Sequence, residues 1–204
     1  MLRLALVWLA TVFGKGPGEF DPSWSQLFEG SANLWALTEG THVLSLALFA
    51  GTIFLVDLRL LGVVFRRTPV SVISAKLLPL TVFGFCLMAL SGAGLFFAKP
   101  LIYYHSVWFR LKVIFILIAF LNIVIFHWRV WHDVEKWDTL ERPPISARAS
   151  AIVSLAAWLV VIACGRYIAY NWFDCGKRQP TWVNVAASCA ASESGAINLK
   201  GQKL

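Results

Sequence analysis

Residues 38–62 read Thr38-Glu-Gly-Thr-His-Val-Leu-Ser-Leu-Ala-Leu-Phe-Ala-Gly-Thr-Ile-Phe-Leu-Val-Asp-Leu-Arg-Leu-Leu-Gly62, a long apolar run with one histidine near its start. A run of about 20 apolar residues is long enough to cross the hydrocarbon core of a bilayer as a helix. His42 opens this predicted helix, at the edge of the membrane, where an ionisable side chain is costly to place. Because imidazole is a common ligand of haem iron and other transition metals, His42 is the first candidate site residue.

The composition of the whole chain indicates a membrane protein. Of 204 residues, 58% are hydrophobic and 14% are charged, and the mean hydropathy is +0.69. The net charge of +7 is concentrated between apolar runs, which favours membrane topology and anionic lipid over nucleic acid as its explanation. Each apolar run has about the length that spans a bilayer, and the four runs cover residues 42–64, 77–98, 108–127 and 152–169.

These runs predict an all-α membrane protein, a four-helix antiparallel transmembrane bundle joined by short loops. The bundle occupies residues 34–173, preceded by an N-terminal interfacial helix and external loop over 1–33 and followed by an external tail over 174–204. The apolar run 2–13 is too short to span, and no small-residue cleavage pattern follows it. We therefore favour an interfacial helix over a cleavable signal peptide for this run.

The basic residues predict the orientation of the bundle. Lysine and arginine are enriched in cytoplasmic loops, so the loops after the first and third helices are expected inside and both termini outside. Cys175 and Cys189 then lie on the external side, where an oxidising compartment allows a disulfide. The residues that determine the orientation are Arg59, Arg66, Arg67 and Lys76 in the first loop and Arg129, Lys136, Arg142 and Arg148 in the third.

The four histidines fall at two different depths of the predicted membrane bundle. His42 and His105 both belong to the external side, whereas His127 and His132 lie at the other end of the third helix, about 30 Å away. His42 and His105 are therefore the pair that could share one metal or haem iron. The alternative for His42 is a purely structural histidine, bonded to a neighbouring backbone group or to Glu39.

Two cations lie in the same external half. Lys112 follows the start of the third helix and Arg166 lies in the outer third of the fourth. A buried guanidinium needs an anionic partner, and Glu39 or haem propionates would supply one. At the opposite end of the first helix, Asp57 and Arg59 are interpreted as an anchoring pair with Arg59 snorkelling to the headgroups, or as a proton-uptake or partner site.

Several of these residues resemble the copper-resistance D superfamily of bacterial membrane proteins. The resemblance covers residues 34–170, and residues 57–61 are more similar to an uncharacterised four-helix relative of that superfamily. A histidine and lysine arrangement of this kind also resembles the membrane protoporphyrinogen oxidase family, which binds b-type haem. The resemblance implies a bacterial inner-membrane protein, with copper or haem as its ligand, and is carried by His42, Ser91-Gly92, Trp108-Phe109, Lys112 and Asn122.

The function predicted from these residues is haem-based electron transfer. One b-type haem, held by His42 and His105 with Lys112 and Arg166 near its propionates, would exchange electrons between membrane quinone and a periplasmic redox partner. The second hypothesis is a non-catalytic accessory or assembly subunit of a larger membrane complex. A copper permease is third, because Cu(I) favours soft ligands and the chain has only two methionines. No soluble-enzyme motif is present, and the sequence leaves open whether the protein is an enzyme.

Overall fold

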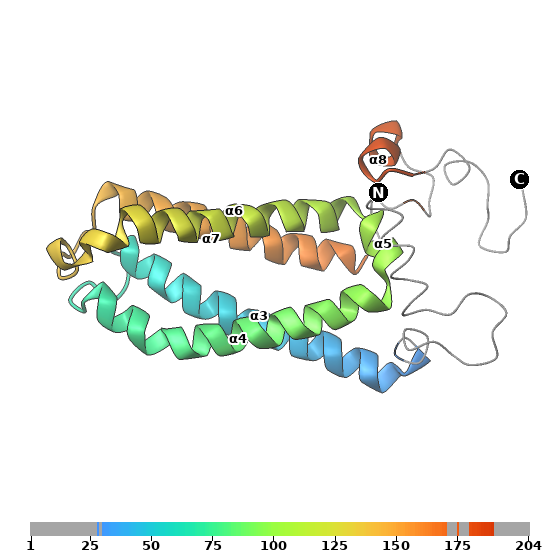
Figure 1. Cartoon of the computed structure of the whole chain (residues 1–204), viewed down its shortest axis with the longest axis horizontal. Helices are drawn as coiled ribbons and strands as arrows, with labels where there is room; N and C mark the ends of the chain where they lie inside the picture. The colour runs from blue at the N-terminus through green and yellow to red at the C-terminus, as the bar shows by residue number, and fades with distance from the viewer. Residues whose placement is uncertain (1–27, 29, 171–174, 176–179, 190–204) are drawn as a thin grey trace, which may run out of the picture. The chain divides into compact units, whose positions relative to one another are not determined.

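The computed structural model describes residues 28, 30–170, 175 and 180–189, and in these the chain is helical with no strand (Figure 1). Four long apolar helices dominate: α3 (Ala32–Leu60), α4 (Val70–Ala98), α6 (Val107–Arg129) and α7 (Ile145–Ile168). Each is long and apolar enough to cross a membrane, which confirms the predicted all-α membrane bundle. Shorter helices are α5 (Pro100–Tyr104), the 3-10 helix η1 (Trp131–Lys136) and α8 (Thr181–Ala186). The predicted interfacial helix over 1–33 lies almost wholly outside the described residues.

The first helix begins ten residues earlier than the sequence predicted. Its N-cap is Ser31, whose side chain accepts a hydrogen bond from the backbone N–H of Leu34. The prediction that His42 opens the helix is therefore wrong, because the polar residues 38–41 continue the helix instead of ending it. The predicted start of the second helix was also late: α4 begins directly after Pro69 and runs through Pro79.

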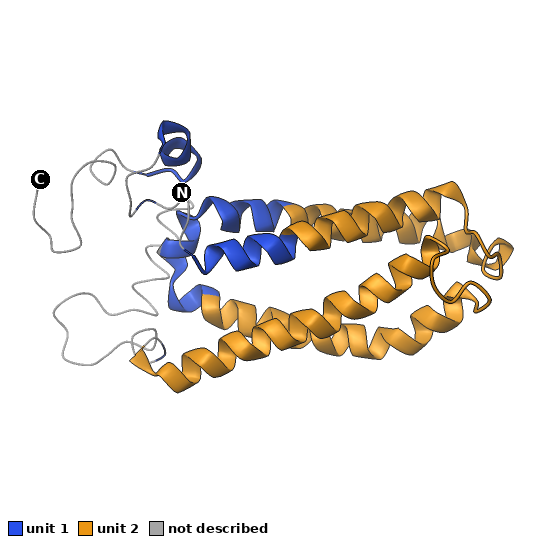
Figure 2. Cartoon of the chain, turned by 180° about the vertical axis from the view of Figure 1, so that it is seen from behind, with its two compact units in different colours: residues 1–28, 96–114, 161–204 blue, residues 29–95, 115–160 orange. Residues whose placement is uncertain are grey.

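The chain divides into two compact units, which are coloured separately in Figure 2. Unit 2 comprises Glu29–Leu95 and Phe115–Val160, and unit 1 comprises the remaining residues. Helices α4, α6 and α7 contribute residues to both units, so each unit is described by itself below.

In unit 2, small and aromatic residues bring α3 and α4 together. A Cβ added to Gly84 would lie only 3.0 Å from the backbone nitrogen of Phe49, so these two helix backbones approach closely. Phe49 also packs edge-on against Trp158 of α7, with ring centroids 4.8 Å apart. The outer faces are apolar, with Leu90 72% and Phe120 65% exposed, as expected of helices that contact lipid.

The loop end of unit 2 is held by a fully buried arginine. Arg59 has no exposed surface, and its guanidinium donates hydrogen bonds to the backbone carbonyls of Thr68, Asp138 and Leu140 at 2.8, 3.4 and 3.1 Å. The carboxylate of Asp138 accepts hydrogen bonds from the backbone N–H and hydroxyl of Ser71 in the first turn of α4. The snorkelling role predicted for Arg59 is wrong, because its hydrogen bonds tie the two loops to each other and turn it away from solvent.

In unit 1, a disulfide joins Cys175 to Cys189 beside α8, the pairing that the sequence allowed. Arg110 of α6 donates to the carbonyl oxygens of Ala186 and Ala187, at the end of α8. The same side chain stacks its guanidinium 4.8 Å from the ring centroid of Tyr104. The described part of the C-terminal tail is thus attached to α6 by an arginine and closed by a disulfide.

Candidate functional site

His42 lies in the third turn of α3, half-buried, with its imidazole directed at α4. Its Nδ1 is 3.1 Å from the carbonyl oxygen of Met88 and 3.2 Å from Oγ of Ser91. A carbonyl oxygen only accepts, so Nδ1 carries the proton and the lone pair of the neutral ring is on Nε2. A histidine that binds a metal through one nitrogen commonly donates its other N–H in this way.

The imidazole of His42 lies against the backbone of Gly92, where a larger residue would force the ring to shift. A Cβ on Gly92 would lie 2.9 Å from Cε1 of His42, closer than real Cβ atoms come, and 3.3 Å from Nδ1, which is a tight contact. Ser91 therefore orients the ring while Gly92 makes room for it. The alternative prediction for His42, a purely structural histidine bonded to a neighbouring backbone group, agrees in part with the structure. The ring does bond a backbone group, although that group is on another helix.

His105 belongs to unit 1, whereas His42 belongs to unit 2. Nδ1 of His105 donates to the carbonyl oxygen of Ala187 at 3.0 Å and lies 3.4 Å from Sγ of Cys175. Its tautomer therefore matches that of His42, with the lone pair of the neutral ring on Nε2. The sharing of one iron by both histidines stays a prediction.

The two predicted cations differ from each other. Lys112 is partly buried, with Nζ 3.7 Å from the position of a Cβ on Gly165. Arg166 is exposed, and its guanidinium lies 5.0 Å from the ring centroid of Tyr170. The expectation of a buried Arg166 is wrong because Cys164 faces inward, and two residues further along a helix is about 200° around it.

Within the described residues, no group of three or more histidine, cysteine or acidic side chains is arranged to hold a metal ion. A site closed entirely by protein ligands, as in a structural zinc centre, therefore has no counterpart in the described part. Haem differs, because the porphyrin supplies four ligands to the iron and the protein supplies only one or two.

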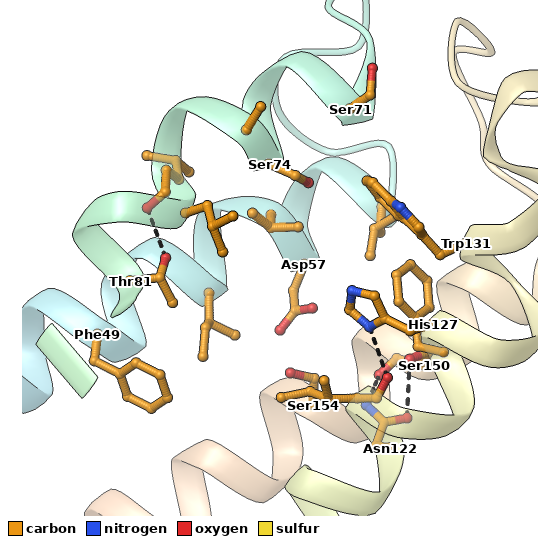
Figure 3. A pocket seen from close by; sticks show the side chains of 18 residues that line it. Phe49, Asp57, Ser71, Ser74, Thr81, Asn122, His127, Trp131, Ser150 and Ser154 are labelled. Carbon is orange, nitrogen blue, oxygen red and sulfur yellow. Dashed lines mark hydrogen bonds between the residues drawn. The ribbon is translucent and has the colours of Figure 1, made fainter. Parts of the chain in front are cut away.

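A second candidate site is a cavity of about 480 Å³ inside unit 2, lined by residues of α3, α4, α6, η1 and α7 (Figure 3). Asp57 points into it from α3, and His127 lines it from α6. From the sequence, Asp57 was predicted to belong to an anchoring pair or to a proton-uptake or partner site, and no cavity was predicted beside it. The sequence did contain one signal for the cavity, the spacing of two serines. Ser150 and Ser154 are four residues apart, so they lie on one face of α7, and both line the cavity.

Comparison with known proteins identifies a family for this chain. No curated protein and no solved structure matches the chain. A family model matches residues 30–171, which include all four long helices and both candidate sites. The chain belongs to this family, described as a family of unknown function (DUF6644).

Proposed function

We propose that the chain is a membrane haem protein in which Nε2 of His42 would bind the iron of a b-type haem. The hydrogen bond from Nδ1 of His42 to the Met88 carbonyl carries this proposal, because it sets the tautomer and ring orientation that a ligating histidine needs. Ser91 supports the same orientation, and the absence of a side chain at Gly92 provides the space. Four-helix membrane bundles are suited to such sites, since ligands project from facing helices.

His105 and Lys112, which belong to unit 1, are the further candidates for haem binding from the sequence. Nδ1 of His105 donates to the Ala187 carbonyl, so the lone pair of its neutral ring is on Nε2. Lys112 is a partly buried cation that suits a haem propionate, because a buried ammonium needs an anion beside it. Arg166 is no longer included, since its guanidinium lies on an exposed face against Tyr170.

The proposed activity is electron transfer in the bacterial inner membrane. A bound haem supplies a one-electron carrier, and a single site near one face cannot carry electrons across the whole bilayer. The exchange is therefore between membrane quinone and a periplasmic redox partner on the side of His42. The distribution of lysine and arginine between the loops supports a periplasmic location for both chain termini.

The absorbance spectrum of protein purified from haem-replete cells tests this proposal. We expect a Soret band that shifts on reduction and is lost in His42→Ala, while His132→Ala, at an exposed histidine, keeps it. A colourless and fully folded preparation would contradict haem binding. It would leave the alternative prediction, an accessory subunit of a larger membrane complex. Stoichiometric copper in the same preparation would instead support a copper transporter.

A second variant tests the orientation of His42 without removing it. Gly92→Ala places a methyl group 2.9 Å from Cε1 of the imidazole, which must then shift, so we expect loss or a marked shift of the Soret band. Gly94→Ala is the matched control, because its new Cβ would meet only Cγ2 of Thr38 at 3.9 Å, an ordinary contact. Equal spectra for the two variants would show that the position of the His42 ring has no part in haem binding.

The disulfide provides a test of the orientation. With Cys86 and Cys164 replaced by alanine, we expect Cys175 and Cys189 to resist alkylation in intact bacterial cells until a reductant is added. The reason is that disulfides persist in the periplasm, whereas thiols in the cytosol are kept reduced. Both thiols reacting without reductant would place the tail in the cytosol and reverse the proposed topology.

A further inference from the structure

The cavity in unit 2 combines apolar walls with a single carboxylate. Its volume of about 480 Å³ is within the range of small-molecule sites, and Phe49, Ile53 and Phe126 form part of the walls. Asp57 is only 6% exposed and is aimed into this space, as Figure 3 shows. The cavity therefore presents an acidic group to whatever occupies it.

Most other polar groups that line the cavity already bond to the protein. Thr81 donates to Thr52 at 2.9 Å, and His127 donates from Nδ1 to the Ile123 carbonyl at 2.9 Å. Asn122 and Ser150 exchange two hydrogen bonds of 3.0 Å, which tie α6 to α7. These groups connect neighbouring helices or shape the cavity wall. The carboxylate of Asp57 therefore carries the strongest hydrogen-bond acceptor in the cavity that still lacks a partner within the described residues.

The carboxylate of Asp57 lacks a cationic partner within the described residues. Ser154 interacts with it, yet Oδ2 is buried without any hydrogen-bond partner in the described structure. Arg59, two residues further along α3, directs its bonded nitrogens to the loop carbonyls. No lysine or arginine is among the described residues that line the cavity, and His127 is the one other titratable side chain there. A buried carboxylate in such surroundings costs several kcal/mol unless it takes up a proton or a cation joins it.

We propose that this cavity binds a small lipophilic amine, whose ammonium donates a hydrogen bond to Oδ2 of Asp57 and whose apolar body contacts the cavity walls. An ammonium supplies both of the missing features, a positive charge and an N–H donor. The site is independent of the proposed haem, since Asp57 is 15 residues from His42, about 22 Å along α3.

Isothermal titration of the full-length protein in lipid nanodiscs tests this, with empty nanodiscs subtracted to remove partitioning. The probes are 1-aminoadamantane, 1-adamantanol and 1-adamantanecarboxylate, which share one apolar body. We expect the amine to bind at least about tenfold more tightly than the other two, the effect of one charge-assisted hydrogen bond. Asp57→Asn should remove that preference. Asp133→Asn should keep it, because Asp133 is an exposed carboxylate that pairs with Lys136.

Two results would overturn the proposal: equal binding of the amine and the alcohol, or an Asp57→Asn variant that keeps the preference for the amine. If Asp57→Asn does not fold, Ser74→Phe fills the cavity from α4 and leaves the carboxylate in place. Amine binding that survives Ser74→Phe would equally contradict the site. Because the readout is heat of amine binding, it is separate from the Soret band that tests the haem.

Discussion

Arg59→Ala is expected to lower the free energy of unfolding by about 3 kcal/mol or more. The substitution removes a fully buried side chain that donates part-buried hydrogen bonds to three backbone carbonyls, and the loss of each such hydrogen bond costs about 1 kcal/mol or more. Arg59→Lys should recover only part of the loss, since an ammonium cannot reproduce the spread of a planar guanidinium. Denaturant-induced unfolding in detergent, followed by tryptophan fluorescence, measures the change.

Arg67→Ala is the matched control for this experiment. Arg67 lies in the same loop but is exposed, and surface substitutions of this kind change stability by about 0.5 kcal/mol at most. A loss for Arg59→Ala as small as that for Arg67→Ala would mean that the loops do not depend on the buried guanidinium.

Gly84→Leu is expected to destabilise the protein by about 3 kcal/mol, the upper part of the range for overpacking. The added Cβ alone would lie 3.0 Å from the backbone nitrogen and 3.3 Å from Cα of Phe49. Backbone atoms cannot swing aside as a side chain does, so α3 and α4 must separate, and the Thr52–Thr81 hydrogen bond is strained with them. The same unfolding measurement reports the loss.

Gly51→Leu separates this effect from the general consequence of adding a leucine to a membrane helix. Gly51 is exposed on α3, and a Cβ there would meet nothing within 4 Å. The two variants add the same atoms to the same kind of helix, so their difference measures the close approach. Equal stability of the two variants would rule out tight packing of α3 against Gly84.

The four long helices could be predicted from the sequence because an apolar run long enough to span a membrane is a strong and local signal. The ends of the helices were predicted less well: the polar residues 38–41 concealed ten residues of α3, and the polar residues Ser71, Ser74 and Lys76 concealed the first turns of α4. Both polar stretches are tolerated within a long helix.

The candidate sites, like the helices, could be predicted only where the sequence carries a local pattern. His42 and Ser91-Gly92 were identified from a pattern, and the structure brings them into contact. The role of Arg59 was not predictable, because its partners are backbone carbonyls up to 81 residues away, and a carbonyl has no sequence signature. The cavity at Asp57 depends on the separation between helices, which a single sequence does not encode in any local pattern.

The buried Arg59 also constrains the order in which the chain can be assembled during synthesis. One of its acceptors, the Thr68 carbonyl, follows closely, whereas the Leu140 carbonyl is made 81 residues later. At about 5–20 residues per second, the ribosome needs about 4–16 s to supply it. During that delay the first helical hairpin carries an incompletely satisfied guanidinium, so a nascent chain arrested before residue 138 should be an early target of membrane-protein quality control.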